Sequence, residues 1–251
     1  MKRFLVLLPL LTMLSACVSN VKPNPNILRV GISPNSPPLI YKTDGKIVGV
    51  EASFAKEVSE KLNRKLVFVE VPWPKQMEYL ENDKTDIIMS GMTVTPTREY
   101  RVNFTKPYML SGLTPLFRRS DYAASGLVQS IIRQQNSTIG TVKDTTGEIF
   151  AKDAYPKATV LVYKSKDDAV AALKSGRINM MIHDATQVWW IASNNEAELV
   201  AFPEIINTEP LAWAISKSNM ELLEQVNAIL DQMKNDGSGE KILKNWFPDT
   251  Y

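Results

Sequence analysis

Ser90-Gly91-Met92-Thr93-Val94-Thr95-Pro96-Thr97-Arg98 is a stretch that gathers several groups suited to binding a carboxylate. The apolar run directly before it, residues 87–89, predicts a buried strand. Thr95-Pro96 predicts a helix N-cap followed by proline at the first helical position. Free N–H groups, threonine hydroxyls and the Arg98 guanidinium therefore converge at one strand end, where they can hold a carboxylate. The alternative is a plain strand–helix turn with a surface arginine.

Apolar patterns on both sides of this stretch predict alternating strands and helices. Before it, the side chains of one helix face recur every four residues, at Val50, Phe54, Val58 and Leu62. Strands are expected around this helix at residues 28–32 and 66–71. After the stretch, a second series predicts strands at residues 138–142, 160–163 and 179–182, with a helix over 167–175. Strand–helix–strand order is typical of βαβ units and a mostly parallel sheet.

The two series predict an α/β protein with two lobes, each a mostly parallel sheet flanked by helices. We expect lobe 1 to comprise residues 27–112 and 208–251, and lobe 2 to comprise residues 113–207. Two extended crossings, near residues 112 and 208, would connect the lobes as a hinge. Polar groups at the carboxyl ends of the strands would then line a ligand crevice between the lobes.

The amino terminus predicts export and lipid anchoring. Lys2-Arg3 and the apolar residues 4–14 are typical of a secretory signal peptide, which we place at residues 1–16. Leu14-Ser15-Ala16-Cys17 matches a bacterial lipobox, and Cys17 is the only cysteine. We therefore expect cleavage before Cys17, acyl chains on this cysteine, and a polar tether over residues 17–26. The protein would lie on the periplasmic side of a bacterial cell membrane. The alternative is an ordinary signal peptide with an incidental cysteine.

Composition argues against several other functions. The 29 Lys and Arg residues nearly balance the 27 Asp and Glu residues, for a net charge of +2, and cleavage would remove Lys2 and Arg3. A neutral surface argues against nucleic acid as a partner. A single cysteine leaves no disulfide framework. No spacing of His, Cys and carboxylates suggests a metal site, and we expect no cofactor.

The crevice offers complementary charges from its two lobes. Lobe 1 contributes Gly91, Thr93 and Arg98, and lobe 2 contributes Thr145, Thr146 and Asp184. An arginine facing an aspartate suits a zwitterion, whose α-carboxylate would pair with Arg98 and whose ammonium would pair with Asp184. Buried charges must be paired, so closure around such a ligand is favoured. The alternative role for Asp184 is to cap the helix that follows it.

Aromatic residues are candidates for a wall of the same site. Trp73 lies between Pro72 and Pro74 and is therefore expected to project from a loop. Together with Tyr41 it could provide an apolar or cation–π surface; the alternative is ordinary packing within lobe 1. His183, the only histidine, is interpreted as a packing residue beside Asp184 and not as a catalyst.

The residues from Ser90 to Arg98 resemble the Ser-Gly-Met-Thr-Ile-Thr-Pro-x-Arg motif of the periplasmic amino-acid-binding proteins of bacterial ABC importers. Val102-Asn103-Phe104-Thr105-Lys106-Pro107-Tyr108 is similar to the family's Val-Asp-Phe-Ser-x-Pro-Tyr. The resemblance covers nearly all of the chain after the signal peptide and implies the two-lobed periplasmic-binding-protein fold. It also implies ligand-binding roles for the motif residues Ser90, Gly91, Thr93 and Arg98, for Thr145, Thr146 and Asp184, and for Trp73 as an aromatic clamp.

The chain departs from this family at four places. Asp144 stands where the turn before Thr145 normally has glycine, and Val50-Glu51 replaces the usual Phe-Asp. Ser36 replaces a stacking aromatic residue of the first loop. Ser33 stands where binders of cationic amino acids often have an aspartate, which mildly disfavours lysine or arginine as the ligand.

The resemblance implies a non-enzymatic, monomeric receptor that captures a polar amino acid and delivers it to the membrane subunits of an ABC importer. One alternative is a sensor module without an importer. Another is a periplasmic cyclohexadienyl dehydratase, a related group on the same fold that acts on prephenate or arogenate. Glu148 would then be the general acid, with a pKa raised by burial in the cleft. The structural interpretation of Thr145-x-x-Glu148 is a capping box at a helix start.

Overall fold

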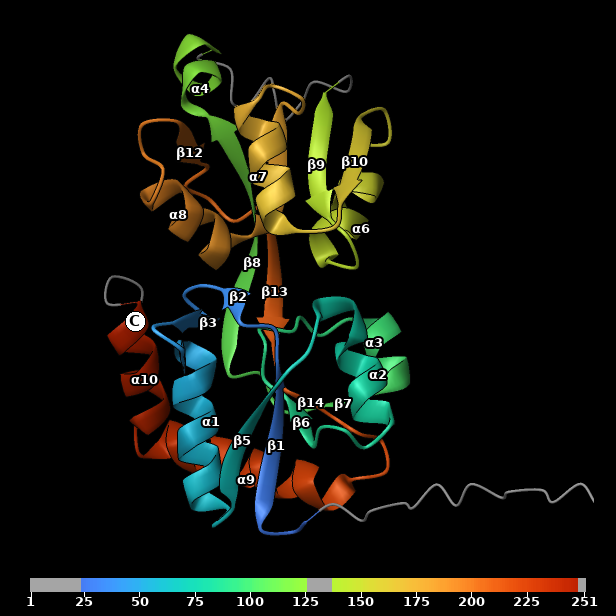
Figure 1. Cartoon of the computed structure of the whole chain (residues 1–251), viewed down its shortest axis with the longest axis vertical. Coiled ribbons are helices and arrows are strands. Elements are labelled where there is room, and N and C mark those ends of the chain that lie inside the picture. The colour runs from blue at the N-terminus through green and yellow to red at the C-terminus, as the bar shows by residue number, and fades with distance from the viewer. Residues whose placement is uncertain (1–23, 126–136, 248–251) are drawn as a thin grey trace, which may run out of the picture.

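The computed structural model describes residues 24–125 and 137–247. Figure 1 shows two lobes, which are joined by the long strand β8 (Met109–Arg118) and by β13 (Asn207–Leu211). The predicted signal peptide, Cys17 and most of the predicted tether lie outside the described residues. Within the described ranges, no helix combines the length and the apolar character needed to cross a membrane.

Lobe 1 is built on a five-stranded sheet. In spatial order its strands are β5 (Lys65–Glu70), β1 (Ile27–Ile32), β6 (Ile87–Ile88), β14 (Ala214–Ile215) and β7 (Asn103–Phe104). The first three run parallel, and β14 is antiparallel to both of its neighbours. The sheet is therefore mixed, because the chain returns from lobe 2 to complete it.

Helices cover both faces of this sheet and bury two apolar clusters against it. They are η1 (Trp73–Lys75), a single 3₁₀ turn, α1 (Val50–Lys61), α2 (Gln76–Glu81), α3 (Pro96–Arg101), α9 (Met220–Asn235) and α10 (Ser238–Trp246). The predicted face of α1 is correct, because Val50, Phe54 and Val58 are all buried in the core. Trp213 is fully buried there, stacked on Tyr108 with ring centroids 5.3 Å apart.

Lobe 2 repeats this plan around a six-stranded sheet. Its strands, in spatial order, are β10 (Thr159–Tyr163), β9 (Thr138–Val142), β11 (Met180–Asp184), β8 and β12 (Leu199–Ala201), with β13 also paired to β8. Strands β10, β9 and β11 are parallel, and β8 is antiparallel to β11. The helices are α4 (Arg119–Ser125), α6 (Thr146–Ala154), α7 (Lys166–Lys174) and α8 (Ala185–Ser193). The predicted two-lobed α/β fold is confirmed.

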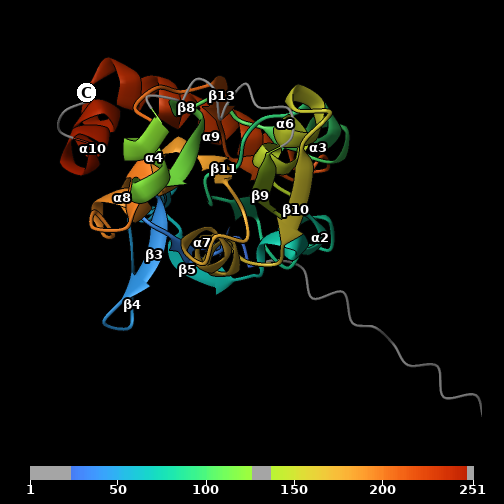
Figure 2. The same cartoon turned by 90° about the horizontal axis from the view of Figure 1, so that it is seen from above.

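A small antiparallel sheet lies beside the main sheet of lobe 1. It consists of β2 (Asn35–Ser36), β3 (Ile40–Thr43) and β4 (Lys46–Val48). The β3–β4 hairpin extends away from the body of the molecule (Figure 2). The turn at Asp44-Gly45 has positive φ at both residues, which is typical of a two-residue hairpin turn with the sequence Asp-Gly.

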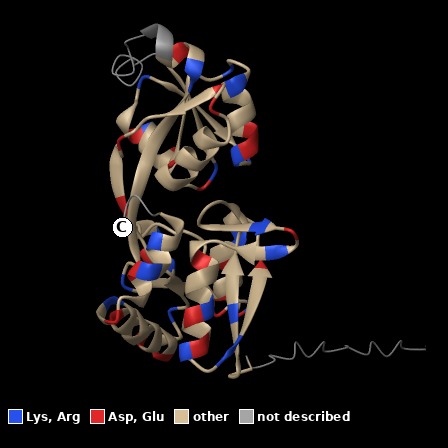
Figure 3. Ribbon diagram, turned by 90° about the vertical axis from the view of Figure 1, so that its left-hand side faces the viewer, with Lys and Arg blue, Asp and Glu red and all other residues tan. Residues whose placement is uncertain are grey.

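Charged residues of both signs are interspersed over the two lobes (Figure 3). Several form exposed ion pairs, including Lys106–Asp231 and Arg101–Glu81, each with 2.6 Å between nitrogen and oxygen. Exposed pairs of this kind contribute about 0–1 kcal/mol each. The fold therefore depends on its apolar cores and not on surface charge.

The two crossings lie side by side, because β13 pairs antiparallel with β8 and Thr208 is directly opposite Gly112. A Cβ on Gly112 would lie 2.1 Å from the Asn207 carbonyl oxygen and 2.4 Å from the Ile205 side chain. A backbone oxygen cannot move away as a flexible side chain can. The close approach of the two crossing strands therefore requires glycine at this position. The exact lobe boundaries stay a prediction.

Gly112→Ala is expected to destabilise the protein by about 1–3 kcal/mol, because overpacking must push β8 and β13 apart. For a chain of this size, each kcal/mol lowers the melting midpoint by about 2–4 °C. Gly239→Ala is the control, since its nearest neighbour would be 3.5 Å away. Melting followed by circular dichroism checks the difference; equal midpoints for both variants would contradict the packing argument.

Candidate ligand site between the lobes

A cavity of about 230 Å³ lies between the lobes and is lined by both of them. Eight of the nine predicted ligand-binding residues line it. From lobe 1 these are Trp73, Ser90, Gly91, Thr93 and Arg98, and from lobe 2 they are Thr145, Thr146 and Asp184. A concave site of this size suits a small molecule. In the described part of the chain, no cluster of three or more His, Cys, Asp or Glu residues could hold a metal ion.

The ninth residue, Tyr41, does not line the cavity. Its ring lies 5.8 Å from that of Trp190 in lobe 2 and 6.3 Å from that of Trp246. Tyr41 therefore belongs to an aromatic contact between the lobes, outside the ligand site. Ser36, which replaces an aromatic residue of the resembling family, does line the cavity.

Arg98 is positioned by the helix start that the sequence predicts. Thr95 is the N-cap of α3, its hydroxyl accepts a hydrogen bond from the Arg98 N–H at 3.3 Å, and Pro96 occupies the first turn. Arg98 as a whole is only 8% exposed. Its Nη1 donates to the Thr93 carbonyl at 2.8 Å, and its carbon lies 5.2 Å from the centre of the Trp73 ring. Arg98 is therefore a rigid, desolvated cation in the cavity wall.

The charges around Arg98 explain what the site can bind. Burial lowers the pKa of Arg98, and the negative charges of Asp184, Glu209 and Asp144 oppose that shift. A desolvated guanidinium gains from any anion that approaches it. The cavity therefore favours a carboxylate at the Arg98 end.

Asp184 ends β11 and begins α8. It occupies the N-cap position, but its side chain makes no capping hydrogen bond. Instead, its Oδ2 accepts a bond from Gln187 Nε2 at 3.1 Å. The capping role weighed as an alternative is therefore not formed, and the carboxylate is left available to the cavity that it lines.

His183 is buried beside Asp184, and it also lines the cavity. Its Nδ1 lies 3.2 Å from Asp184 Oδ2 but has no hydrogen-bond partner within the described residues. Burial lowers the pKa of His183, and Asp184 opposes this shift. At neutral pH the ring is therefore uncharged, and Asp184 keeps its negative charge for another cation.

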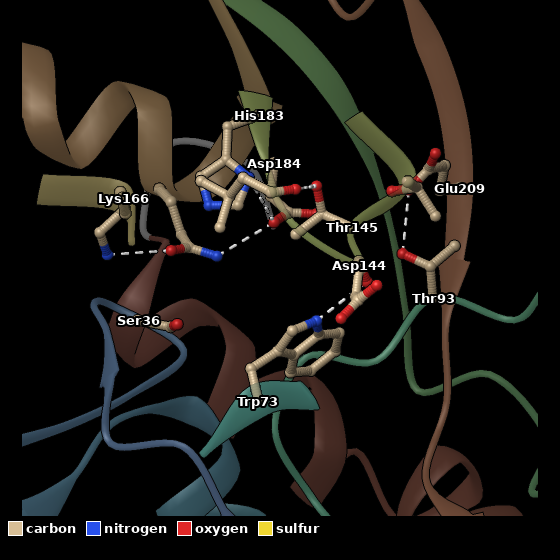
Figure 4. Close-up of polar contacts among 12 residues, drawn as sticks. Ser36, Trp73, Thr93, Asp144, Thr145, Lys166, His183, Asp184 and Glu209 are labelled. Atoms are coloured by element: carbon tan, nitrogen blue, oxygen red, sulfur yellow. Dashed lines mark hydrogen bonds and ion pairs between the residues drawn. The ribbon is translucent and has the colours of Figure 1, made fainter. Parts of the chain in front are cut away.

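Glu209 is a residue that the sequence analysis missed. It lies on β13, and its Oε2 accepts bonds from the hydroxyls of Thr93 at 2.9 Å and Thr146 at 2.8 Å (Figure 4). Burial raises the pKa of Glu209, and bonds from these threonines and from Asn207 oppose the shift. One carboxylate on a crossing strand thus connects both lobes next to the ligand cavity. A charged residue within a predicted hinge was the signal that could have revealed it.

A second contact joins the lobes at the turn before α6. The Asp144 carbonyl accepts a bond from Trp73 Nε1 at 3.0 Å (Figure 4). It also accepts a bond from Arg98 Nη2 at 3.3 Å. Asp144 has a φ of +61°, in the left-handed region that favours glycine but that aspartate tolerates. Aspartate can therefore replace the family's glycine at this turn, because both residues tolerate a left-handed backbone.

Both interpretations of Glu148, as a general acid in the cleft and as part of a capping box, are wrong. Glu148 does not line the cavity. Its carboxylate accepts the Asp144 N–H at 2.9 Å and pairs with Lys152 at 2.5 Å. Although burial acts to raise its pKa, these bonds lower it on balance, opposite to the need of a general acid. The capping box is also not formed, because the Thr145 hydroxyl makes no cap bond and donates to the Val142 carbonyl instead.

Glu51, which departs from the family pattern, holds the loop that carries Gly91. It is fully buried. Its carboxylate accepts bonds from the Gly91 N–H at 2.6 Å, from the Tyr108 hydroxyl at 2.8 Å and from Trp213 Nε1 at 2.8 Å. Helix α1 thereby fixes the backbone of the loop that carries Gly91. Glu51 and Gly91 are 40 residues apart in the sequence, so no local pattern predicts this contact.

The family of this chain follows from its whole length and not from the cavity alone. A family model described as bacterial extracellular solute-binding proteins, family 3, matches residues 28–249. The chain belongs to this family. The predicted resemblance is confirmed, and the two lobes around one cavity are the arrangement of a solute-binding protein.

Relatives of this solute-binding protein include transport components. The ABC transporter arginine-binding protein 1 of Escherichia coli (strain K12) is 28% identical over 227 residues, 88% of this chain and 90% of that protein. A solved structure of a putative ABC transporter binding component from Wolinella succinogenes, complexed with lysine, is 30% identical with a TM-score of 0.81, covering 90% of this chain and 97% of that one. An ancestral amino acid-binding protein, a precursor of cyclohexadienyl dehydratase, is 32% identical with a TM-score of 0.79, covering 88% and 95%.

The Glu51 carboxyl is expected to make the stability of this solute-binding protein depend on pH. Burial raises its pKa from 4.5 to about 7, against the hydrogen bonds from Gly91, Tyr108 and Trp213. Between these values the folded state holds a proton that the unfolded state has lost. The free energy of unfolding therefore falls by about 3 kcal/mol in total as pH rises from about 4.5 to 7. Above pH 7 this contribution does not change further.

Glu51→Gln isolates this effect, because glutamine cannot titrate. We expect the unfolding free energy of the wild type minus that of the variant, measured by urea denaturation, to fall between pH 4 and 8. A difference that stays constant over this range would show that burial does not raise the pKa of Glu51.

Proposed function

We propose that this protein is a receptor that closes its two lobes on a free amino acid and delivers it to an ABC importer. The observation that carries the proposal is the desolvated Arg98 guanidinium, which shares one cavity with the carboxylate of Asp184. Arg98 would bind the α-carboxylate and Asp184 the α-ammonium. A zwitterion neutralises both protein charges at once, which a ligand with one charge cannot do.

The relatives support this role. The Escherichia coli protein is named for arginine binding and for an ABC transporter, and the Wolinella succinogenes structure holds lysine. Their names agree on an amino acid as the ligand. The backbone groups of the amino acid are common to all such ligands, and Arg98 and Asp184 are the residues that would bind them here.

A binding role without turnover suits the cavity better than the dehydratase alternative does. The one carboxyl group considered as a general acid, Glu148, is paired with Lys152 and does not line the ligand cavity. The relative described as a precursor of cyclohexadienyl dehydratase is itself an amino acid-binding protein. We therefore propose that the protein is not an enzyme.

We further propose that the receptor acts as a monomer outside the cytoplasmic membrane and is held at a membrane by acyl chains on Cys17. The support is the lipobox Leu14-Ser15-Ala16-Cys17 and the mixed surface charge. Several acyl chains give stable anchoring, since each buried methylene contributes about 0.8 kcal/mol.

Arg98→Ala is expected to weaken amino acid binding by about 2–5 kcal/mol, which is roughly 30-fold or more in the dissociation constant. A thermal-shift screen of free amino acids first identifies the ligand, and isothermal titration calorimetry then compares the variants. Arg101→Ala is the matched control, because Arg101 lies on the same helix but pairs with Glu81 at the surface. It should bind as the wild type does.

Two outcomes would contradict the proposal. Normal binding by a folded Arg98→Ala variant would show that the site is elsewhere. A thermal shift with prephenate or arogenate alone, with turnover of either, would favour the dehydratase.

Cys17→Ala is expected to release the protein from membranes, because it removes the acylation site. Expression in a bacterial cell with labelled palmitate and fractionation of the membranes measure this. The wild type should be labelled and sediment with membranes, whereas the variant should be unlabelled and soluble. Equal labelling of both would exclude Cys17 as the modified residue.

A further inference from the structure

Lys166 is a second cation in the cavity wall, and the sequence analysis did not single it out. It is the first residue of α7, after the N-cap Ser165, whose hydroxyl accepts the Asp168 N–H at 3.2 Å. Its ammonium reaches across to lobe 1 and donates to the Asn35 carbonyl at 2.6 Å. It also donates to Gln187 Oε1 at 3.0 Å within lobe 2 (Figure 4). The start of α7 therefore places a fixed positive charge at the boundary of the two lobes.

Gln187 connects this charge to the proposed ammonium subsite. Its Nε2 donates to Asp184 at 3.1 Å, while its Oε1 accepts from Lys166. The charged groups on either side fix the orientation of this amide. Asp184 and Lys166 therefore mark two neighbouring subsites of opposite charge, separated by one side chain.

The Lys166 ammonium is only partly satisfied by the protein. It carries three N–H donors, and two of them have acceptors within residues 24–125 and 137–247. Burial lowers the pKa of Lys166 to about 8, even though Asp167 and Asp184 act to raise it. Protein groups thus compensate this charge incompletely, and a third acceptor in the cavity would stabilise it.

The rest of the cavity wall has the same sign. Lys143 and Lys164 also line it, and Asp184 is the one acidic residue among the lining residues. Near Asn35, lobe 1 contributes only the neutral side chains of Ser33 and Ser36. Once Arg98 and Asp184 bind the two charges of an amino acid backbone, nothing in this wall remains to neutralise a cationic side chain.

We propose that Lys166 determines the specificity of this cleft and that the ligand is an amino acid whose side chain ends in a hydrogen-bond acceptor, an amide or a carboxylate. The inference rests on the proposed receptor function and deepens it. It also separates this chain from the relatives that are described with arginine and lysine, since those side chains would place a cation against Lys166.

A purely structural role for Lys166 makes a different prediction. If the residue only ties the lobes together through the Asn35 carbonyl, its loss weakens every ligand by the same factor. If it contacts the ligand's side chain, its loss weakens glutamine or glutamate far more than it weakens arginine or lysine. The ratio of affinities, and not the affinity itself, is therefore the informative readout.

The experiment is isothermal titration of the full-length protein, with the wild type and the variants Lys166→Met and Lys166→Glu, at pH 7. The probes are L-glutamine, L-asparagine, L-glutamate, L-aspartate, L-arginine and L-lysine. Lys174→Met is the control, because Lys174 lies at the other end of α7 and pairs with Glu198. Melting midpoints confirm that each variant folds.

We expect the wild type and Lys174→Met to bind an amide or acidic amino acid at least tenfold more tightly than arginine or lysine. Lys166→Met should reduce this ratio at least tenfold, and Lys166→Glu should reverse it. A glutamate-to-glutamine ratio that falls in Lys166→Met identifies a carboxylate as the natural side chain, and an unchanged ratio identifies an amide.

Four results would overturn the inference. The first is a wild-type protein that binds arginine or lysine as tightly as glutamine and glutamate. This result overturns the inference even if no variant folds. Equal weakening of all six amino acids by Lys166→Met would reduce Lys166 to a structural tie. Weak binding of all six probes by a wild type whose thermal-shift screen identifies an apolar amino acid would leave the receptor function intact and remove this specificity. If no amino acid binds the wild type, the receptor function fails and the inference fails with it.

Discussion

A positive charge removed from water is the constraint on which the rest of this structure depends. The Arg98 guanidinium is almost fully buried at the junction of two lobes, where burial lowers its pKa. Helix α3, the ring of Trp73 and the carbonyls of Thr93 and Asp144 hold it in place. These neutral partners accept two of the bonds that its five N–H donors can make, and they carry no net charge that could pair with it. An anion between the lobes is therefore the partner that this arrangement favours most.

Two buried acids adapt the scaffold to that charge. Glu209 lies on the crossing strand β13 and accepts hydrogen bonds from a hydroxyl group of each lobe. One carboxylate thus joins the crossing strand to both lobes. Glu51 lies beneath the loop that carries Gly91 and fixes its backbone. Both carboxyl groups have raised pKa values because they are buried. The site is thus a set of opposed, partly compensated charges on rigid elements.

Local patterns were enough to predict the fold and most of the candidate site. The apolar period of α1, the Thr95-Pro96 helix start and the run before Ser90 depend on neighbouring residues, and the structure has each of them. Crossings near residues 112 and 208 were expected from composition, and these residues are paired. Ligand roles for the eight residues that line the cavity stay predictions.

What the sequence could not provide are contacts between distant segments. Glu51, Glu209 and Lys166 acquire their roles from partners 40 to 131 residues away, which no local spacing reveals. The same limit explains the errors. Tyr41 packs on Trp190 of the other lobe and not on the ligand cavity, and Glu148 bonds the N–H one residue before the expected one.

The most direct test of the central claim is to remove one charge of the ligand at a time. The amino acid that raises the melting midpoint most would be titrated calorimetrically, followed by its α-methyl ester and its N-acetyl derivative. If Arg98 binds the carboxylate and Asp184 the ammonium, the ester leaves Arg98 without its anion and the acetyl derivative leaves Asp184 without its cation. Each derivative should then bind at least about 30-fold more weakly than the free amino acid, a loss of about 2 kcal/mol. An ester or acetyl derivative that binds as tightly as the free amino acid would contradict the account.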